Sequence, residues 1–262
     1  GRPYYSIIDK LETIKDDIII AAENGGIVIE KENILLCTPL PKTSLFEIEN
    51  LADSINDIHP VFCTRSKAYL KKTSTAYINT LSEYYPNYEL INSTLDINED
   101  ILKIALYNED DSEKNIYPLF EQFKPNYKVI VSGENWVDIS HVLANKGHAI
   151  KLIQKLYNIT SDETLVFGDY DNDIEMLDQS TFSFAMENAN ENIKKTASHE
   201  TKSNNHFDFS QILLKTMDEF RQLGNYSAHR IEYNCLQGEI DEVKREFRVS
   251  VEEMLYKSGI LK

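Results

Sequence analysis

An apolar run that leads directly into a cluster of acids is the feature that most constrains how this chain folds. Residues 164–167 read Thr-Leu-Val-Phe, and the next segment, GDYDNDIEML, carries Asp169, Asp171, Asp173 and Glu175. A short apolar run bounded by a turn residue is typical of a buried strand. Open α/β sheets bind their ligands in the crevice outside the carboxyl ends of such strands. The segment therefore predicts an α/β fold with a ligand site at one strand end.

The spacing of these acids does not fit a calcium-binding loop. Such a loop needs glycine at its sixth position and glutamate at its twelfth, and here those positions hold Ile174 and Ser180. Carboxylates without histidine or cysteine suit Mg²⁺, which takes one or two of them and completes its shell with water and phosphate oxygens. Asp169 and Asp173 would both face the crevice, which points to phosphate chemistry. The alternative is a solvated helix N-terminus, where the helix dipole favours acids.

Apolar periodicity predicts alternating strands and helices over most of the chain, with no glycine- or proline-rich linker between them. The middle section reads as one compact α+β unit, and the alternation from residue 146 to 197 predicts a parallel sheet. The expected strands are 17–22, 27–30, 34–37, 61–64, 67–72, 101–108, 127–132, 164–169 and 181–186, of which 27–30 and 34–37 form a hairpin. The expected helices are 4–14, 44–58, 74–85, 112–124, 146–156, 172–177 and 191–197, with an almost wholly helical segment over 207–262 after them.

Composition narrows the class of partner. The chain carries 43 acidic against 27 basic residues, a formal charge of -16 that repels polyanions and makes a nucleic-acid surface unlikely. No apolar run approaches the roughly 18 residues of a membrane span. Cys37, Cys63 and Cys235 lack the spacing of a disulfide framework or zinc site. We expect a soluble, cytoplasmic protein with no membrane partner, and no motif specifies its oligomeric state.

Several segments, in order along the chain, resemble the haloacid dehalogenase (HAD) superfamily in its Cof-like sugar-phosphatase subgroup. GDYDNDIEML, together with AMENANENIKKTA and SNN further along, resembles the fourth motif and the C-terminal run of that family. NKGHAIKLI has the form of the third motif, GRPYYS resembles the residues directly after the second motif, and ENGGIVI resembles the entry into the cap. The resemblance extends from Gly1 to about Leu214.

This resemblance implies an α/β fold with three parts. A Rossmann-like core, here incomplete, would comprise residues 1–21 and 138–215. An α/β cap domain would be inserted at 22–137. An all-helical C-terminal appendage would occupy 216–262.

The resemblance also implies an activity and roles for single residues. The family's enzymes are Mg²⁺-dependent phosphatases that act on small phosphorylated metabolites, such as sugar phosphates, through an aspartyl-phosphate intermediate. By position, Asp169 would ligate Mg²⁺, and Asp173 would support the ion directly or through water. Lys146 would neutralise the charge of the nucleophile and of the phosphoryl oxygens. Phosphoryl transfer depends mostly on positioning and charge stabilisation, which a lysine and a metal ion supply.

Three further residues would bind phosphate or substrate by the same resemblance. Asn172 would contact the phosphate, or the substrate near the cap. Arg2 comes just after the second motif, and Asn24 lies at the cap entry, where it would help to close the site. Asn24 is equally well explained as a turn residue.

The family's first motif, an apolar strand that ends in D-x-D and supplies the nucleophile, has no counterpart in residues 1–262. Asp16-Asp17 precede a strand instead of ending one, Asp110-Asp111 lie in an acidic loop, and Asp208 begins a helix. The phosphate-binding Ser or Thr of the second motif would immediately precede Gly1. We therefore expect an N-terminally truncated fragment that is inactive on its own. The alternative is a catalytically dead relative that only binds a ligand.

The tail suggests a third possibility. FRQLGNYSAHRIEY and the amphipathic helix after it weakly resemble the end of HEPN-type helical domains, some of which cleave RNA with an Arg and a His. Arg221 and His229 are the matching positions. A packing or dimerisation element is the structural alternative, and the acidic charge disfavours RNA.

We predict that the purified chain of residues 1–262 hydrolyses no phosphate ester, because it offers no nucleophilic D-x-D strand end. The DNA directly upstream of the Gly1 codon checks the reason: an in-frame strand ending in D-x-D-G-T would supply the missing motif, whereas a start codon there would favour ligand binding. Mg²⁺-dependent hydrolysis of an aryl phosphate by this chain, lost in Asp169→Ala, would contradict the prediction.

Overall fold

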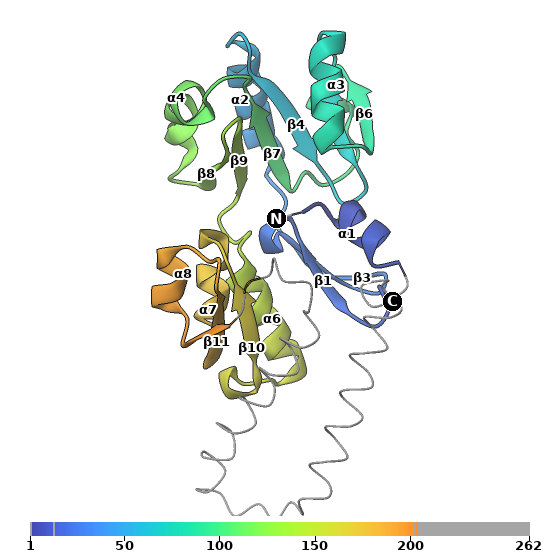
Figure 1. Ribbon diagram of the computed structural model, residues 1–262. Coiled ribbons are helices and arrows are strands. Elements are labelled where there is room, and N and C mark those ends of the chain that lie inside the picture. The colour runs from blue at the N-terminus through green and yellow to red at the C-terminus, as the bar shows by residue number, and fades with distance from the viewer. Residues whose placement is uncertain (1, 13, 202, 204–262) are drawn as a thin grey trace, which may run out of the picture. The chain divides into compact units, whose positions relative to one another are not determined.

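The computed structural model describes residues 2–12, 14–201 and 203, which divide into two compact units (Figure 1). Among these residues, the first unit takes in those up to Asp9 and Ile18–Ala149, and the second takes in those of Lys10–Asp17 and from Ile150 onward. Within the described part of the chain, no helix combines the length and the apolar character that a membrane crossing needs. The helices expected over 207–262 lie outside the described residues.

A six-stranded sheet forms the larger part of the first unit. Its strand order is β6–β5–β4–β7–β9–β8, and the neighbouring pairs are antiparallel except for β5 and β6. The strands are β4 (His59–Cys63), β5 (Ala68–Lys71), β6 (Tyr88–Ile91), β7 (Lys103–Tyr107), β8 (Tyr127–Gly133) and β9 (Trp136–His141). The central strand β7 is buried along its whole length.

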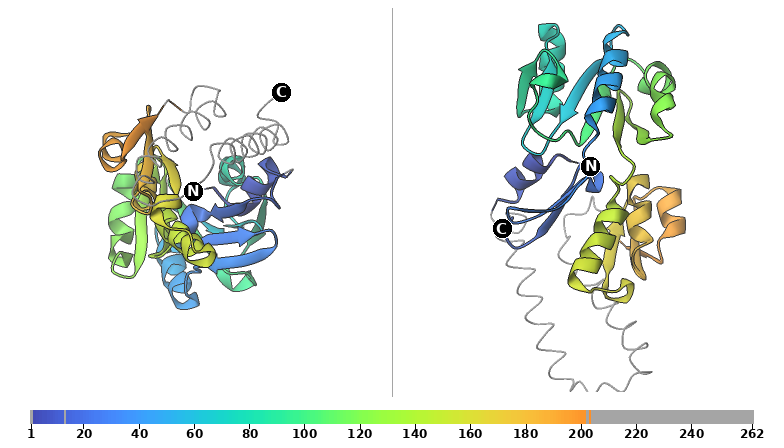
Figure 2. Two further views of the ribbon diagram at one scale, coloured as in Figure 1. Left: turned by 90° about the horizontal axis from the view of Figure 1, so that it is seen from below. Right: turned by 180° about the vertical axis from the view of Figure 1, so that it is seen from behind.

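The apolar side chains of this sheet belong to two separate cores. Phe62 of β4 packs in the core that includes helix α2 (Lys42–Asp53), whereas its neighbour Val61 packs in the core that includes helix α3 (Thr75–Tyr84). Successive residues of a strand point to opposite faces, so one step along β4 changes the core that a side chain joins. Helices α2 and α3 accordingly lie on different sides of the sheet in Figure 1 and in the reverse view of Figure 2.

A smaller antiparallel sheet completes the first unit. It contains β1 (Ile19–Ala22), β2 (Ile27–Glu30) and β3 (Asn33–Cys37), and helix α1 (Tyr4–Lys10) contributes Tyr4 to its core. The turn between β2 and β3 includes Lys31, whose φ is 55°. The hairpin expected from residues 27–37 is thereby confirmed.

The second unit has a parallel sheet. Strands β10 (Leu165–Gly168), β11 (Phe182–Met186) and β12 (His199–Thr201) pair in that order, with Gly168 opposite Ala185. Helices α7 (Ile174–Leu177) and α8 (Glu191–Thr196) supply Leu177 and Ile193 to its core. Helix α6 (Lys146–Tyr157) begins at the end of the first unit and continues in the second.

The expected α/β fold and the parallel pairing of β10 with β11 are confirmed. The sequence pattern missed β6, β9 and β12. Strand β9 was missed because Asp138, in the middle of the strand, breaks the apolar pattern of the sequence. In the structure the side chain of Asp138 is buried. The helix expected over 112–124 is divided into α4 (Ser112–Asn115), α5 (Tyr117–Phe120) and a 3₁₀ turn. Pro118, in the first turn of α5, has no N–H with which to continue α4.

We predict that Phe62→Ala destabilises the protein by about 3–5 kcal/mol, because it removes a large side chain from a core that collapses only partly around the cavity. Phe62 is fully buried, whereas Phe46 of α2 is 56% exposed. Phe46→Ala is therefore the matched control and should change stability by about 0.5 kcal/mol or less. Urea unfolding monitored by circular dichroism measures both, and equal losses would contradict the two-core packing.

Candidate active site

The acidic segment forms a turn that Asp173 holds closed. The turn begins after the last residue of β10 and continues into a short 3₁₀ helix over Asp171–Asp173. Oδ2 of Asp173 accepts a hydrogen bond from the backbone N–H of Asp169 at 3.1 Å, and the N–H of Asp173 donates to the carbonyl of Tyr170 at 2.8 Å. Asp173 is buried, whereas Asp169 is half-buried and Tyr170 is exposed. One carboxylate of the motif thus fixes the backbone, and Asp169 stays partly accessible.

Gly168 makes this closure possible. A Cβ atom at that position would lie 2.7 Å from the Cβ of Asp173 and 3.3 Å from its Oδ2, closer than two carbon atoms pack. Any side chain at 168 would therefore push Asp173 away from the amide that it binds. The glycine that the sequence pattern marked as a turn residue is required here by close approach.

The start of helix α8 holds Asp171. The side-chain amides of Asn190 and Asn192 donate to Oδ1 of Asp171 at 2.9 and 3.1 Å. Asn190 also caps helix α8 through Oδ1, which accepts from the N–H of Ile193 at 3.0 Å, and its own N–H donates to the carbonyl of Asp169 at 3.3 Å. The segment AMENANEN therefore supports the acidic turn directly. The sequence pattern assigned no role to these asparagines, although an Asn before a helix is a capping signal.

Lys146 is the first residue of helix α6. The preceding Asn145 caps that helix, because its Oδ1 accepts a hydrogen bond from the N–H of His148 at 2.7 Å. A lysine at this end lies at the positive pole of the helix dipole, which disfavours cations. Helix stability therefore does not explain why a lysine begins α6.

The turn that contains Asn24 lies against the start of α6 in the first unit. Glu23, Asn24 and Gly25 have φ values of 48°, 56° and 88°. A Cβ on Gly25 would lie 2.4 Å from the carbonyl oxygen of Asn145 and 3.2 Å from the Cα of Lys146. The left-handed backbone of Asn24 is the conformation of a turn residue, and asparagine tolerates it well.

Arg2 meets the same turn through its backbone, because its carbonyl accepts from the N–H of Glu23 at 3.0 Å. The first unit therefore brings three residues predicted far apart in sequence, Arg2, Asn24 and Lys146, to one turn and its neighbours. The second unit holds Asp169, Asn172 and Asp173 in another. Arg221 and His229 lie outside the described residues.

The acidic turn offers carboxylate oxygens, which are the donors that Mg²⁺ takes in proteins. Among the described residues, no group of three or more His, Cys, Asp or Glu side chains converges on a possible metal position. Mg²⁺ commonly binds through one or two carboxylates and takes its other ligands from water and phosphate. Asp169, half-buried on a turn whose backbone is fixed, has the donor chemistry and the rigidity for such a contact.

Comparison with known proteins identifies the family. Residues 1–208 match a family described as haloacid dehalogenase-like hydrolases. The chain is 28% identical over 219 residues to 5-amino-6-(5-phospho-D-ribitylamino)uracil phosphatase YbjI of Escherichia coli K12, an alignment that covers 83% of this chain and 81% of the relative. These matches agree with the resemblance read from the motif-like segments.

Solved structures share the fold. The crystal structure of SMU.1108c from Streptococcus mutans UA159 superposes with a TM-score of 0.70 at 27% identity, over 84% of this chain and 83% of that one. The HAD subclass IIB sugar phosphatase BT4131 superposes with a TM-score of 0.67 at 16% identity, over 83% and 82% of the two chains. The Rossmann-like HAD fold expected from the sequence is thereby confirmed.

We predict that Gly168→Ala destabilises the second unit by about 1–3 kcal/mol, because the added methyl group overpacks against Asp173. Gly133→Ala is the matched control, since a Cβ there would first meet Trp136 at 3.6 Å, an ordinary contact. Thermal unfolding of the two variants measures the difference. A Gly168→Ala protein as stable as Gly133→Ala would show that the close approach to Asp173 is not tight.

Proposed function

This chain belongs to the haloacid dehalogenase-like hydrolases, and we propose from that membership that it serves to hydrolyse the phosphate monoester of a small phosphorylated metabolite with the help of Mg²⁺. The chain is a HAD-type phosphatase by family. The name of the E. coli relative describes a phosphatase of a phosphorylated ribityl compound, which supports a sugar phosphate or a similar polyol phosphate as substrate. The observation that carries the proposal is the turn locked by Asp173, on which Asp169 stays half-buried.

Each residue contributes a separate part of the proposed chemistry. Asp169 would hold the metal ion, which when bound neutralises negative charge on the phosphoryl oxygens. Asp173 would act behind it by keeping the backbone of Asp169 in place through the 3.1 Å hydrogen bond. Lys146 would place a positive charge beside the phosphoryl group, where charge builds up during transfer. Asn172, Asn24 and Arg2 would orient the phosphate or the rest of the substrate.

We propose the domain division of the family for this chain as well, with a core of 1–21 and 138–215 and a cap of 22–137. An aspartyl-phosphate route requires a nucleophilic aspartate at a D-x-D strand end. Asp169 and Asp173 do not fill that place, because Asp173 is committed to the backbone and Asp169 to the proposed metal contact. A ligand-binding protein without turnover is the second candidate function, and a start codon directly before the codon for Gly1 would favour it.

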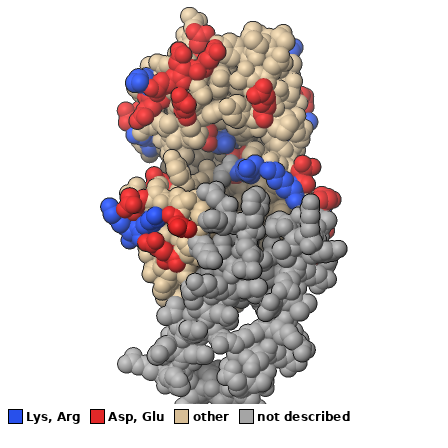
Figure 3. Space-filling model, viewed as in Figure 1, with Lys and Arg blue, Asp and Glu red and all other residues tan. Residues whose placement is uncertain are grey.

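A small anionic substrate suits the charge of the molecule better than a nucleic acid. Acidic side chains gather on the first unit around the end where α4 lies, on the face shown in Figure 3. With a formal charge of -16, an extended polyanion would be repelled, whereas one phosphate group can be bound locally by a metal ion and a lysine. We also propose a cytoplasmic location.

We predict that Asp169→Asn lowers the kcat of the protein, translated from its natural start codon, by about 100-fold or more on p-nitrophenyl phosphate, because an amide neutralises the proposed metal ligand. Asp178→Asn is the matched control, since Asp178 is exposed after the end of α7, and its kcat should be unchanged. Added Mg²⁺ should restore activity after chelation in the control and not in Asp169→Asn.

Other outcomes separate the two candidate functions. Binding of inorganic phosphate, measured by calorimetry, without hydrolysis of any phosphate ester would favour the ligand-binding protein. Equal activity of Asp169→Asn and the wild type would overturn the proposed role of Asp169.

A further inference from the structure

A buried ion triad joins the turn of residues 23–25 to the six-stranded sheet of the first unit. Nζ of Lys103, on β7, lies 3.2 Å from Oε2 of Glu23 and 3.2 Å from Oδ2 of Asp138, on β9. The side chains of Glu23, Lys103 and Asp138 are only 1%, 8% and 9% exposed. The triad is therefore removed from solvent, and it ties a loop residue to two central strands.

The charges of the triad do not balance. Two carboxylates share one ammonium group, and Oε1 of Glu23 is buried without a hydrogen-bond partner among the described residues. Burial raises the pKa of Glu23, and the nearby Lys103 offsets only part of that shift. Burial alone would lower the pKa of Lys103, but Asp138 and Glu23 outweigh it and hold that pKa well above its usual value. Lys103 thus stays charged, whereas the carboxylate form of Glu23 is disfavoured by its burial.

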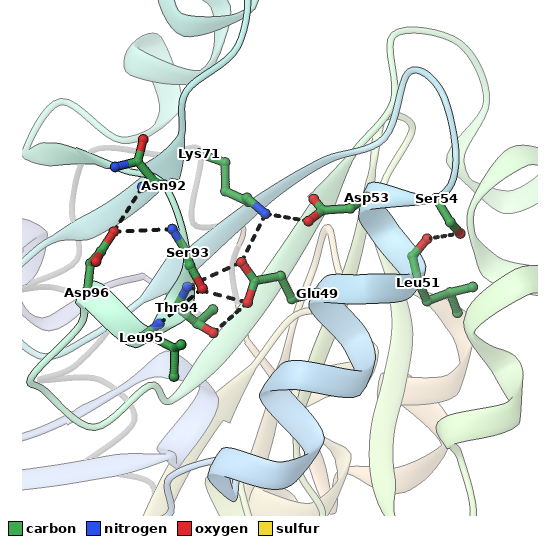
Figure 4. Close-up of polar contacts among 10 residues, drawn as sticks. All are labelled: Glu49, Leu51, Asp53, Ser54, Lys71, Asn92, Ser93, Thr94, Leu95 and Asp96. Carbon is green, nitrogen blue, oxygen red and sulfur yellow. Dashed lines mark hydrogen bonds and ion pairs between the residues drawn. The ribbon is translucent and has the colours of Figure 1, made fainter.

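Glu49, elsewhere in the first unit, shows what a fully satisfied buried glutamate looks like (Figure 4). Its carboxylate pairs with Lys71 at 2.9 Å and accepts hydrogen bonds from the N–H and the hydroxyl of Thr94 at 3.2 and 2.5 Å. Glu23 has the ion pair without such hydrogen bonds. Burying an incompletely paired carboxylate is destabilising, so the stability of the sheet alone does not account for Glu23.

The backbone of Glu23 is strained as well. Its φ of 48° is left-handed, a conformation that is strained for a residue other than Gly, Asn or Asp. The next two residues, Asn24 and Gly25, share the left-handed region and tolerate it better. The strained turn persists because it is held at both ends, by the triad at Glu23 and by Thr38, whose N–H and hydroxyl donate to the carbonyl of Gly26 at 2.9 and 3.0 Å.

This turn presses against the residues that begin helix α6. The gap between Gly25 and the carbonyl of Asn145 is too small for a Cβ atom, which would lie 2.4 Å from that oxygen. Asn145 in turn caps α6 through the N–H of His148, and Lys146 is the first residue of the helix. A continuous line of contacts therefore runs from Lys103 through Glu23 and Gly25 to the backbone of Asn145 and Lys146.

We propose that Glu23 is a positioning residue for Lys146: anchored to Lys103, it holds the left-handed turn against the carbonyl of Asn145 and so fixes the start of α6. That Lys146 needs a fixed position rests on the proposed function. How Glu23 fixes that position rests only on the geometry of the first unit. Buried charge and backbone strain at Glu23 are then the cost of keeping a lysine in one position at a helix end that does not favour it.

Hydrogen–deuterium exchange tests the positioning without any need for activity. The amides of His148 and Ala149 are bonded to Oδ1 and O of Asn145, so they report whether the start of α6 is fixed. We expect Glu23→Ala to speed their exchange about 10-fold or more relative to the amides of β7. Gly25→Ala, which disturbs the turn without touching the triad, should do the same. Glu23→Gln keeps the size of the side chain and an acceptor for Lys103, and should stay close to wild type.

Glu49→Ala is the matched control, because it removes another buried, lysine-paired carboxylate of the same unit that bonds Thr94 instead of the turn. It should leave exchange at His148 and Ala149 unchanged relative to β7. If Glu23→Ala changed that exchange no more than Glu49→Ala does, Glu23 would be a structural residue only and the proposal would be overturned.

A double-mutant cycle tests the link to Lys146 on the protein translated from its natural start codon. With p-nitrophenyl phosphate, Glu23→Ala should lower kcat about 10-fold with little change in KM, and should cause no further loss in the Lys146→Ala background, because residues that act through one another are not additive. The same loss in both backgrounds would contradict positioning. A wild type that hydrolyses nothing would refute the proposed function instead, and the exchange experiment would still decide whether Glu23 fixes the start of α6.

Discussion

The hydrogen bond from the amide of Asp169 to the carboxylate of Asp173 is the interaction on which the acidic turn and its place in the candidate site depend. It requires Gly168, because no side chain fits beneath Asp173. It leaves the carboxylate of Asp169 as the half-buried acid of a turn whose backbone is already fixed. Pre-organised groups lose little entropy when they bind a ligand, so a short 3₁₀ turn after a strand suffices to hold the candidate metal ligand Asp169 in place.

The first unit also fixes a turn, but with a buried ion pair instead of a local hydrogen bond. Its turn at Glu23–Gly25 is held by a charge buried in a sheet, and again a glycine permits a backbone contact that a Cβ would prevent. Glu49 and Glu23 illustrate two uses of a buried carboxylate. Glu49 is saturated with hydrogen bonds and belongs to the packing of α2, whereas Glu23 keeps one unsatisfied oxygen and a strained backbone. Unsatisfied buried polar atoms and left-handed residues cost stability, and in native proteins they concentrate at functional sites.

Much of this arrangement was predictable from the sequence, and the exceptions share a physical cause. The acidic turn, the helix beginning at Lys146 and the hairpin at 27–37 arise from local patterns, because each depends on residues close in sequence. The role of Asp173 was only partly predictable, since its bond to the amide of Asp169 depends on three-dimensional closure of the turn. Strand β9 was missed because the partner that makes Asp138 tolerable, Lys103, lies on another strand. Glu23 carried no signal for the same reason.

The double role of Asn190 has a consequence for the chemical ageing of the protein. Its side-chain oxygen caps α8 while its side-chain nitrogen donates to Asp171 at 2.9 Å. Asparagine is among the residues that heat degrades most readily, and deamidation would replace that nitrogen by a carboxylate oxygen. The cap on α8 would survive, but two negative groups would then face each other where a hydrogen bond had been. A single hydrolysed amide would loosen the support of the acidic turn while leaving the helix cap intact.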